Sequence, residues 1–407
     1  MSKQETDIGT CPAHWQVVKF SSVAELKHGY QFRTNDFTES GIKVFKITQI
    51  KSDGSIDLSS CSFIDESRLE SFTNNIIKNG DILMALSGAT IGKIGRFRSN
   101  EVVLQNYRVG NFIPLDEKII MKDYFYYFLT TENTYYQIMA NQNQSAQENV
   151  GKADIHNMLV FLPPFEEQKS IAEVLSSLDD KIDLLYRQNQ TLEQMAETLY
   201  DAWFEESDFT SRVSDLIDLQ NGYAFKSKSF QDLGEDRVLK IKNISGGIVD
   251  IETTDFVSHE TVENLDEKFS ISTGDILFAM TGAKIGKMGI IPKTDYKLWL
   301  NQRVGLFKEK YYGSRFLAYL HLKSDYGKDY IENTATGSAQ PNISGTGIEN
   351  CEFPAITEQE IVEYSNQLAP LYEKVIFNLG QIQKLDALRN TLLPKLMGGE
   401  ISINTDG

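Results

Sequence analysis

The chain has 407 residues, of which 41% are hydrophobic and 24% are charged, values typical of a folded globular protein with two or three domains. Its formal net charge of -17 argues against a simple nucleic-acid binder, because such domains are usually basic. No segment has the apolar length of a membrane span or signal peptide, and the three cysteines (Cys11, Cys61 and Cys351) lack metal-ligand spacing, so we expect a reduced, cytoplasmic protein without a structural metal.

The first part of the chain is predicted to form a strand-rich domain. Short apolar or alternating runs at 44–47, 82–86, 91–94 and 102–104 are separated by Gly, Asn, Asp and Ser, which predicts strands joined by turns. Residues 122–140 are rich in Tyr and Phe and are predicted to be helical. We therefore expect a mixed domain in which several strands are followed by a helical region.

A long helix is predicted to follow this domain. Between 165 and 205 the apolar residues recur in steps of three and four, which is the pattern of a coiled-coil seam. Asn189 occupies one expected apolar position and is predicted to fix the register of the seam. The helix would reach ~60 Å, so it needs a partner helix. The central seam residues are Ile182, Leu185, Asn189 and Leu192.

The partner helix is predicted near the end of the same chain. Residues 358–396 repeat the three-four rhythm, and Pro370 within them predicts a kink or a break near the start of the helix. Each helix taken alone is equally consistent with an ordinary amphipathic core helix. Two such helices favour a helical pair within one chain. The central seam residues here are Val375, Leu379, Ile382 and Leu385.

An internal repeat relates the two halves of the chain. Residues 80–93, GDILMALSGATIGK, return as GDILFAMTGAKIGK at 274–287. Four further blocks return at shifts of 193 to 195, namely HGYQF at 28–32, VFKI at 44–47, NYRVG at 106–110 and SAQEN at 145–149. The chain therefore holds two copies of one domain-plus-helix unit, and a second helical region is expected at 311–330.

Basic residues gather within both copies. Residues 84–110 contain four Lys and Arg against one acidic residue, and residues 278–305 contain five against one. By contrast, residues 165–205 contain ten acidic residues and three basic ones. The negative net charge therefore does not exclude an anionic ligand, but it limits where one can bind.

No catalytic or metal site is predicted in this chain. Residues 88–93 resemble a phosphate-binding loop, but three residues separate the two glycines where four are needed, and Ile94 stands where Ser or Thr would bind magnesium. Leu162 cannot accept the hydrogen bond that an adenine methyltransferase loop requires, so Pro163 and Pro164 are interpreted as the entry to the long helix. The five histidines are scattered.

Together these features resemble the specificity (S) subunit of type I restriction-modification systems. The motifs are the GDIL block of each half, LPPFEEQKSIAEVL at 162–175, IGTCPAHW at 8–15 and LRNTLLPKLMGGEI at 388–401. The resemblance covers essentially the whole chain. The second half departs from the first in lacking the Pro-x-x-Trp element at its front.

The resemblance implies an α+β fold with two repeated strand-rich target recognition domains, separated by two long antiparallel coiled-coil helices. The expected boundaries are 1–164 for recognition domain 1, 165–205 for the central spacer helix, 206–355 for recognition domain 2, and 356–407 for the distal spacer helix and C-terminal tail. It also implies a non-catalytic subunit that reads a bipartite, asymmetric double-stranded DNA site.

The same resemblance implies partners. Two methyltransferase (M) subunits and two restriction and translocase (R) subunits would dock on this chain, and S-adenosylmethionine, ATP and Mg would belong to those partners. One adenine in each half-site would be methylated at N6. A fused enzyme and a coiled-coil scaffold without direct base readout are the alternatives.

Candidate DNA contacts follow from the resemblance and the basic stretches. The phosphate candidates are Lys46, Lys93, Arg96, Arg108, Lys240, Lys287 and Arg303. The base-readout candidates are Ser87, Thr90, Gln105 and Tyr107 in the first half, and Thr281, Lys284 and Gln302 in the second. Positions matched between the copies are expected to serve the fold or the DNA backbone, and unmatched neighbours are expected to carry the differing specificities. For each of these polar residues a solvated surface position is the alternative.

Overall fold

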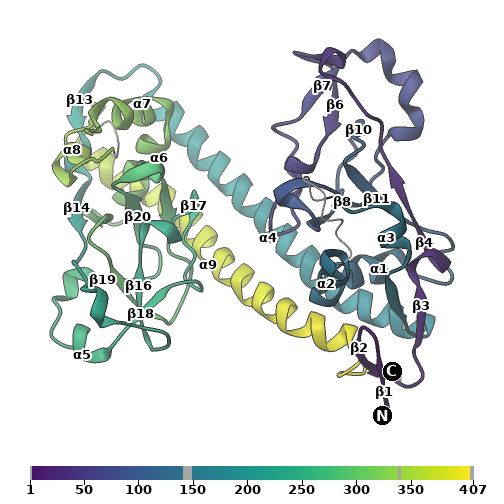
Figure 1. Ribbon diagram of the computed structural model, residues 1–407. Coiled ribbons are helices and arrows are strands. Elements are labelled where there is room, and N and C mark those ends of the chain that lie inside the picture. Colours follow the sequence, from purple (N-terminus) through teal and green to yellow (C-terminus); the bar gives the residue numbers. More distant parts are fainter. Residues whose placement is uncertain (1, 141–148, 338–340, 404–407) are drawn as a thin grey trace. The chain divides into compact units, whose positions relative to one another are not determined.

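The computed structural model describes residues 2–140, 149–337 and 341–403. It divides into unit 1, formed by Met1–Asp179 with Ala387–Gly407, and unit 2, formed by Asp180–Asp386. Most of the repeated block at 145–149 and 338–342 lies outside the described residues. Figure 1 shows the strands of each unit together with the two long helices.

The strands of unit 1 are β1 (Lys3–Thr6), β2 (Gly9–Pro12), β3 (Gln16–Lys19), β4 (Ala24–His28), β5 (Phe37–Thr38), β6 (Ile42–Phe45), β7 (Ser62–Ile64), β8 (Ile82–Ala85), β9 (Ile94–Arg96), β10 (Val103–Gln105), β11 (Val109–Pro114) and β12 (Leu159–Leu162). An antiparallel sheet has the order β4-β11-β8-β9. A second sheet, β10-β6-β7-β5, contains one parallel pair, β10 with β6. The antiparallel pairs β1-β2 and β3-β12 complete the strands.

The strands of unit 2 are β13 (Phe209–Arg212), β14 (Ile217–Asn221), β15 (Phe230–Gln231), β16 (Asp236–Leu239), β17 (Gly247–Ile248), β18 (Asp255–Val257), β19 (Ser270–Ile271), β20 (Ile276–Ala279), β21 (Met288–Ile290), β22 (Lys297–Leu300), β23 (Val304–Glu309) and β24 (Glu352–Pro354). Its sheets have the orders β14-β23-β20-β21-β17 and β15-β18-β16-β22-β19. The parallel pair β16-β22 matches β6-β10 of unit 1. The equivalent strands therefore have the same order in both units, as the sequence repeat predicts, and unit 2 adds one edge strand to each sheet, β17 and β19.

The helices are α1 (Lys122–Leu129), α2 (Glu132–Ala140), α3 (Lys152–His156), α4 (Phe165–Phe204), α5 (His259–Val262), α6 (Ser314–Lys323), α7 (Asp325–Thr334), α8 (Gly345–Glu349) and α9 (Glu358–Met397). In each unit the short helices that follow the sheets gather at one end, α1 to α3 in unit 1 and α6 to α8 in unit 2 (Figure 1). Their apolar faces pack on the antiparallel sheet and on the adjoining part of α4 or α9. The predicted α+β fold class is confirmed.

The predicted strand at 91–94 is corrected, because positive-φ glycines at Gly88 and Gly92 turn the chain before β9 begins. Both regions predicted to be helical are helical, and each contains two helices. In 122–140, α1 ends where the hydroxyls of Thr130 and Thr131 donate to carbonyl oxygens of its last turn. In 311–330, α6 and α7 are separated at Ser324, whose side chain caps α7.

Of the kink or break predicted at Pro370, the break is absent, because α9 continues through that residue. A proline removes one intrahelical hydrogen bond. The neighbouring side chains Leu368, Ala369 and Tyr372 are buried in the core of unit 2, and this packing holds the helix together across the missing bond.

The seam between α4 and α9 lies within unit 2. Trp203, near the end of α4, stacks on Tyr364, near the start of α9, with ring centroids 4.2 Å apart, so the helices run antiparallel there. The seam residues form one apolar cluster, consisting of Ile182, Leu185, Val375, Leu379 and Ile382 with Leu192 and Leu385 packed against them. The apolar faces of α4 and α9 therefore bury each other, as the sequence pattern predicts.

The polar seam residue Asn189 has a buried partner. It is 5% exposed, and its Oδ1 accepts a hydrogen bond of 2.8 Å from Nδ2 of Asn378, which is fully buried. Among the described residues, Nδ2 of Asn189 and Oδ1 of Asn378 have no partner. One hydrogen bond therefore satisfies one oxygen and one nitrogen of the two carboxamides. This bond aligns the two helices in a single register.

The front element of the chain is attached to the start of α4. Nε1 of Trp15 donates to Glu167 at 2.8 Å, and Nε2 of His14 lies 2.7 Å from the same carboxylate. Gln168 is 1% exposed and bonds to the main chain of Ile119, Met121 and Pro163. The Glu-Gln pair of the helix entry thus has a structural role in unit 1.

A buried histidine joins three elements of unit 2. His321 of α6 is 1% exposed, with Nδ1 2.7 Å from Oη of Tyr200 and Nε2 2.7 Å from the main-chain oxygen of Glu352. Because a carbonyl only accepts, Nε2 donates and Nδ1 accepts from the tyrosine. Burial lowers the pKa of His321 to about 4, although the hydrogen bond to Glu352 opposes the shift.

We predict that Asn378→Leu lowers the free energy of unfolding by about 1–3 kcal/mol, because Asn189 is left buried without its partner. The double replacement Asn189→Leu with Asn378→Leu should regain this loss, since no polar group then remains in that layer. Urea denaturation of the wild type, Asn189→Leu, Asn378→Leu and the double variant gives the coupling energy. A double variant less stable than Asn378→Leu alone would contradict this account.

The second prediction concerns pH. Between pH 6.5 and about 4 the unfolded chain binds a proton at His321 that the folded chain does not, so the free energy of unfolding falls as pH falls through this window. The contribution is at most about 3 kcal/mol. His321→Gln, which does not titrate, should show a shallower decline in urea denaturation series from pH 7 to pH 4. Parallel declines would exclude His321 as the source.

Candidate nucleic-acid interface

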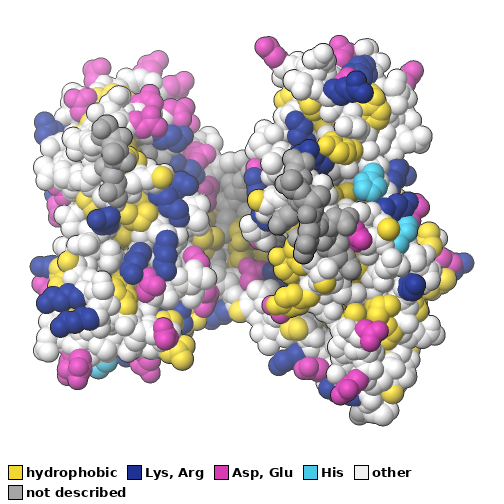
Figure 2. Space-filling model, viewed as in Figure 1, with side chains coloured by type: hydrophobic (Ala, Val, Ile, Leu, Met, Phe, Trp, Pro, Cys, Tyr) yellow, Lys and Arg dark blue, Asp and Glu magenta, His cyan; other side chains and the backbone are white. Residues whose placement is uncertain are grey.

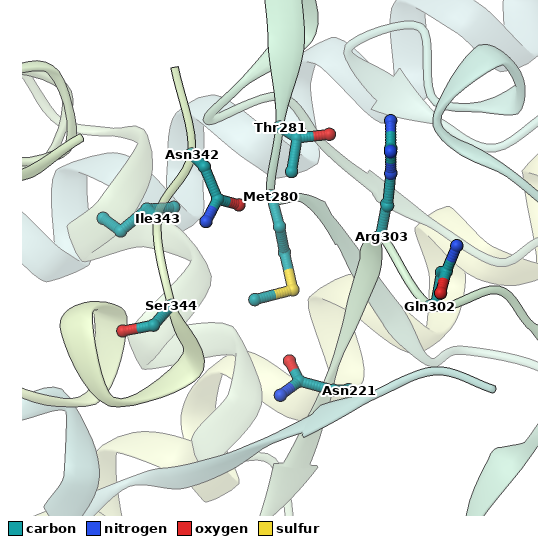
Figure 3. Close-up of a pocket in the computed structure, with 8 residues that line it drawn as sticks. All are labelled: Asn221, Met280, Thr281, Gln302, Arg303, Asn342, Ile343 and Ser344. Carbon is teal, nitrogen blue, oxygen red and sulfur yellow. The ribbon is translucent and has the colours of Figure 1, made fainter. Parts of the chain in front are cut away.

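A four-residue turn between β22 and β23 forms the centre of the candidate site in unit 2. The main-chain N–H of Val304 donates to the oxygen of Asn301 at 2.9 Å, which closes the turn. Gln302 and Arg303 occupy its two central positions and are exposed. They border a hollow of about 540 Å³, shown in Figure 3, lined by Asn221, Met280, Thr281, Gln302, Arg303, Asn342, Ile343 and Ser344.

The turn is held by a close main-chain crossing at the end of β14. A Cβ atom on Gly222 would lie 2.2 Å from the oxygen of Asn301, so only glycine fits there. On either side of this contact, Tyr223 N–H donates to Leu300 at 2.8 Å, and Gln302 N–H donates to Tyr223 at 2.9 Å. The block NGYAF at 221–225, the second copy of HGYQF, therefore fixes the turn through main-chain atoms.

The opposite side of the hollow is also built from main-chain hydrogen bonds. Met280, directly after β20, donates to Arg303 at 3.2 Å and accepts from Ile343 at 3.0 Å. Thr281 forms a bridge with Asn342. In Figure 3 the Met280 thioether points into the hollow, with Asn342 and Asn221 on either side of it.

The polar groups around the hollow are available to a ligand. Asn221, Gln302, Arg303 and Asn342 are exposed. Within the described part of the chain, none of these four side chains makes a hydrogen bond or an ion pair. The hollow thus presents three carboxamides and one guanidinium, groups that can donate to and accept from base edges and phosphates.

Unit 1 repeats this main-chain arrangement. Val109 N–H closes the turn on Asn106 at 3.0 Å, Tyr107 N–H donates to Tyr30 at 2.9 Å, and Leu86 N–H donates to Arg108 at 2.9 Å. A Cβ on Gly29 would lie 2.1 Å from the oxygen of Gln105, matching Gly222. The same backbone frame therefore exists in both units.

The side chains on the two frames differ. By the repeat, Arg108 and Asn149 match Arg303 and Asn342. The unmatched pairs are His28 with Asn221, Tyr107 with Gln302, Ser87 with Thr281, Leu86 with Met280, and Gly151 with Ser344. The frame is constant, and the chemistry that it displays is not.

Three candidate contacts have side chains that are engaged within the fold. Arg96 has an 11% exposed side chain, is paired with Asp123 at 3.0 Å and lies over the Tyr126 ring. Gln105 is 2% exposed and donates to Lys27 and Val109 main-chain oxygens.

Lys284 is the third candidate whose side chain is engaged within the fold. Its ammonium group donates to the main-chain oxygens of Lys242 at 2.9 Å and Ile244 at 3.0 Å. It closes the loop that follows β16, so a DNA contact would require it to leave these carbonyls unpaired.

The remaining candidates are placed as follows. Lys46 lies 4.0 Å over the Phe37 ring, and Lys240 lies 3.8 Å over the Phe230 ring and pairs with Asp255. Lys93 donates to Ser52 at 3.3 Å. Ser87 is 6% exposed, and Oγ1 of Thr90 is buried. Lys287 is exposed, and Tyr107, Arg108, Thr281, Gln302 and Arg303 lie at the turns described above.

Sequence reasoning missed His28, Asn221, Asn149 and Asn342 as possible contacts. The first two lie inside a repeated block, next to the glycine that the crossing requires, and they differ between the copies. That combination of a fixed glycine and a variable neighbour was the available signal.

On the face that Figure 2 shows, the basic residues of each unit do not form one continuous band. Figure 2 shows Lys and Arg side chains scattered over the visible face of each unit among uncharged and acidic ones. Among the described residues, no cluster of His, Cys, Asp and Glu has the arrangement of a metal site. None of the described helices combines the length and apolar character needed for a membrane span.

Comparison with known proteins gives a consistent result. The family model described as the type I restriction modification DNA specificity domain matches residues 12–194 and 206–378. The MjaIX specificity subunit of a type I restriction enzyme from Methanocaldococcus jannaschii is 26% identical over 439 residues, covering 98% of this chain and 96% of that protein.

Two further relatives extend the comparison. The MjaVIII specificity subunit from the same organism is 32% identical over 197 residues, but the match spans only 47% of this chain and 46% of that protein. The crystal structure of a type I restriction-modification S subunit from M. genitalium has a TM-score of 0.59 at 15% identity and covers 94% of this chain and 96% of its own. At this identity the last comparison supports the fold.

The third prediction tests the main-chain crossing. Gly222→Ala should lower the stability of unit 2 by about 1–3 kcal/mol, since the new methyl group meets main-chain oxygen at 2.2 Å. It should also speed hydrogen exchange at the Gln302 amide. Gly246→Ala is the control for strain without a clash, because its Cβ would meet nothing within 4 Å although its φ of +83° disfavours alanine. The strain lies in the loop before β17, so exchange at Gln302 should stay unchanged. Equal exchange in both variants would contradict the crossing as the anchor.

Proposed function

Because this chain belongs to the family of type I restriction-modification DNA specificity domains, we propose that it is the DNA-reading subunit of a type I restriction-modification complex. Each unit reads one half of a bipartite, asymmetric double-stranded DNA site. The observation that carries this proposal is the duplicated frame of Gly29 and Gly222, which displays an exposed arginine and different neighbouring side chains in each unit.

The chemistry of the two turns suits a DNA ligand. Arg108 and Arg303 are exposed, and guanidinium groups neutralise phosphates or bind guanine edges. Lys287 is exposed in unit 2 and adds positive charge near the same block of sequence. Since the acidic residues are concentrated in α4, electrostatic attraction to DNA is expected to come from the domains and not from the long helices.

Base readout requires groups that are not already committed to the fold. Tyr107, Gln302 and Thr281 lie at the turns or line the hollow, and they remain candidates. Differences at these positions explain why the two half-sites of one DNA target would differ in sequence. A coiled-coil scaffold without base readout would give no reason for two such frames.

The remaining parts of the proposal concern architecture. We place recognition domain 1 at 1–164, the central spacer helix at 165–205, recognition domain 2 at 206–355, and the distal helix and tail at 356–407. The seam between α4 and α9 would keep the spacing of the two half-sites constant. Half-sites about 34–36 Å apart present the same face of the duplex.

Catalysis is assigned to partner subunits. We propose that two methyltransferase subunits and two restriction and translocase subunits assemble on this chain, and that they bring S-adenosylmethionine, ATP and Mg. The modification would be N6 methylation of one adenine in each half-site. This chain contributes the choice of sequence and the geometry of the complex, in a bacterial or archaeal defence against foreign DNA.

The fourth prediction tests the arginine contacts. In the complex reconstituted with its methyltransferase subunits, Arg108→Ala with Arg303→Ala should weaken binding to every duplex. The slope of log K against log salt concentration should become shallower by about 2, because two phosphate contacts are lost. Fluorescence anisotropy over a salt series measures both quantities.

A matched control is available in unit 2. Lys297 lies at the start of β22, whereas the turn follows the end of that strand, and it pairs with Glu235 at 3.1 Å. Lys297→Ala should leave the salt slope unchanged. If the double arginine variant binds with the affinity and slope of the wild type, the assignment of these contacts is wrong.

A further inference from the structure

Two positions on the duplicated frame combine fixed main-chain placement with different side-chain chemistry. They are the last residue of β4 or β14, His28 and Asn221, and the first central residue of the turn, Tyr107 and Gln302. Around them the frame is the same in both units, including the arginine and asparagine that match. Of the positions that differ between the units, these two replace a carboxamide with an aromatic ring, which is a change in hydrogen-bonding chemistry.

The main chain at the two positions is anchored. Asn221 precedes Gly222, whose backbone passes against Asn301, and the amide N–H of Gln302 is bonded to Tyr223. The two residues therefore project from strands tied together by short contacts. In Figure 3 Asn221 lies below Met280 and Asn342 lies above it, whereas Gln302 lies to the right, next to Arg303.

The carboxamides of Asn221 and Gln302 are uncommitted. Both residues are exposed, and neither side chain is hydrogen-bonded to any part of the chain that the structure describes. Gln105, the buried glutamine of the first repeat, shows the contrast, since its Nε2 donates to two main-chain oxygens. An exposed amide that contributes nothing to the fold is free to bind a ligand.

We propose that Asn221 and Gln302 are specificity-determining residues of unit 2 and that they read the edge of an A·T base pair. A carboxamide offers a donor and an acceptor that match N7 and the N6 amino group of adenine in the major groove. The proposal rests on the proposed function, because it assigns a base to a DNA half-site. Arg303, which has no partner in the described chain, lies beside them to contact phosphate or guanine.

Unit 1 reads a different base with the same frame. His28 and Tyr107 replace the two amides, and Oη of Tyr107 accepts from Nε of Arg108 at 2.7 Å. The guanidinium carbon also lies 5.4 Å from the Tyr107 ring centroid. Tyrosine thus holds the arginine in unit 1, whereas glutamine leaves it unsupported in unit 2.

The fifth prediction uses a reciprocal exchange. One variant carries Asn221→His with Gln302→Tyr, and the other carries His28→Asn with Tyr107→Gln. Each is expressed with the methyltransferase subunit in a host without other adenine methylation, and modified adenines are mapped by single-molecule sequencing. Each variant should change one half-site of the methylated motif and leave the other half-site as in the wild type.

The outcomes distinguish failure of the residue assignment from failure of the proposed function. Two variants that change different half-sites support the proposal. A variant that methylates the unchanged wild-type motif, or two variants that alter the same half-site, would overturn it. If the wild-type complex methylates no bipartite motif, the proposed function itself fails, whatever the variants do.

A variant that does not methylate at all is resolved by single replacements. Asn221→Ala and Gln302→Ala are assayed in the reconstituted complex by competition between the wild-type duplex and duplexes with one A·T pair replaced by G·C. About tenfold loss of discrimination at one base pair is expected. Discrimination equal to that of the wild type at every position would overturn the assignment. Gln190→Ala, an exposed amide on α4, is the control and should retain full discrimination.

Discussion

The close approach of two backbones at Gly222 is the constraint on which the candidate interface depends. With no side chain between them, β14 and the turn after β22 lie at hydrogen-bonding distance, and the turn takes its shape from main-chain atoms. Gly29 does the same in unit 1. Because peptide groups are common to all residues, a frame of this kind tolerates different side chains at its exposed positions. The glycine itself is the position that cannot vary.

The seam between α4 and α9 depends on side chains, in contrast to the main-chain contacts of the interface. Here side chains determine the arrangement, since Leu, Ile and Val layers would pack in several registers with similar energies. The bond between Asn189 and Asn378 singles out one of them, because any shift would bury both amides unpaired. The buried amide pair therefore selects one register at some cost in stability.

Much of this fold was predictable from the sequence, and the reasons are physical. The repeat and the three-four periodicity are long, redundant signals, so the duplicated domains and both long helices were identified. Burial of single polar residues was not. Gln105 and Tyr107 are two residues apart, yet one is 2% exposed and the other lies on the turn. Arg96 and Arg108 likewise differ only through distant partners such as Asp123. The spacing of residues along the sequence does not reveal which side chains meet when they are far apart in the chain.

Comparing equivalent positions of the two units shows that matched and unmatched residues have different roles in the interface. Matched residues include Asn301 and Asn106, whose main chains form the turn, and a change there would alter the frame for every base. At the unmatched position 221 the side chain has no hydrogen-bond partner among the described residues, so a substitution there changes the exposed chemistry at little expense to folding. At the equivalent position of unit 1, Nδ1 of His28 lies 3.4 Å from the main-chain oxygen of Tyr107. Selection for new DNA targets can therefore act on a few side chains while glycine and peptide groups preserve their placement. A duplicated frame lets each half-site change independently, since a substitution in one unit leaves the main-chain contacts of the other untouched.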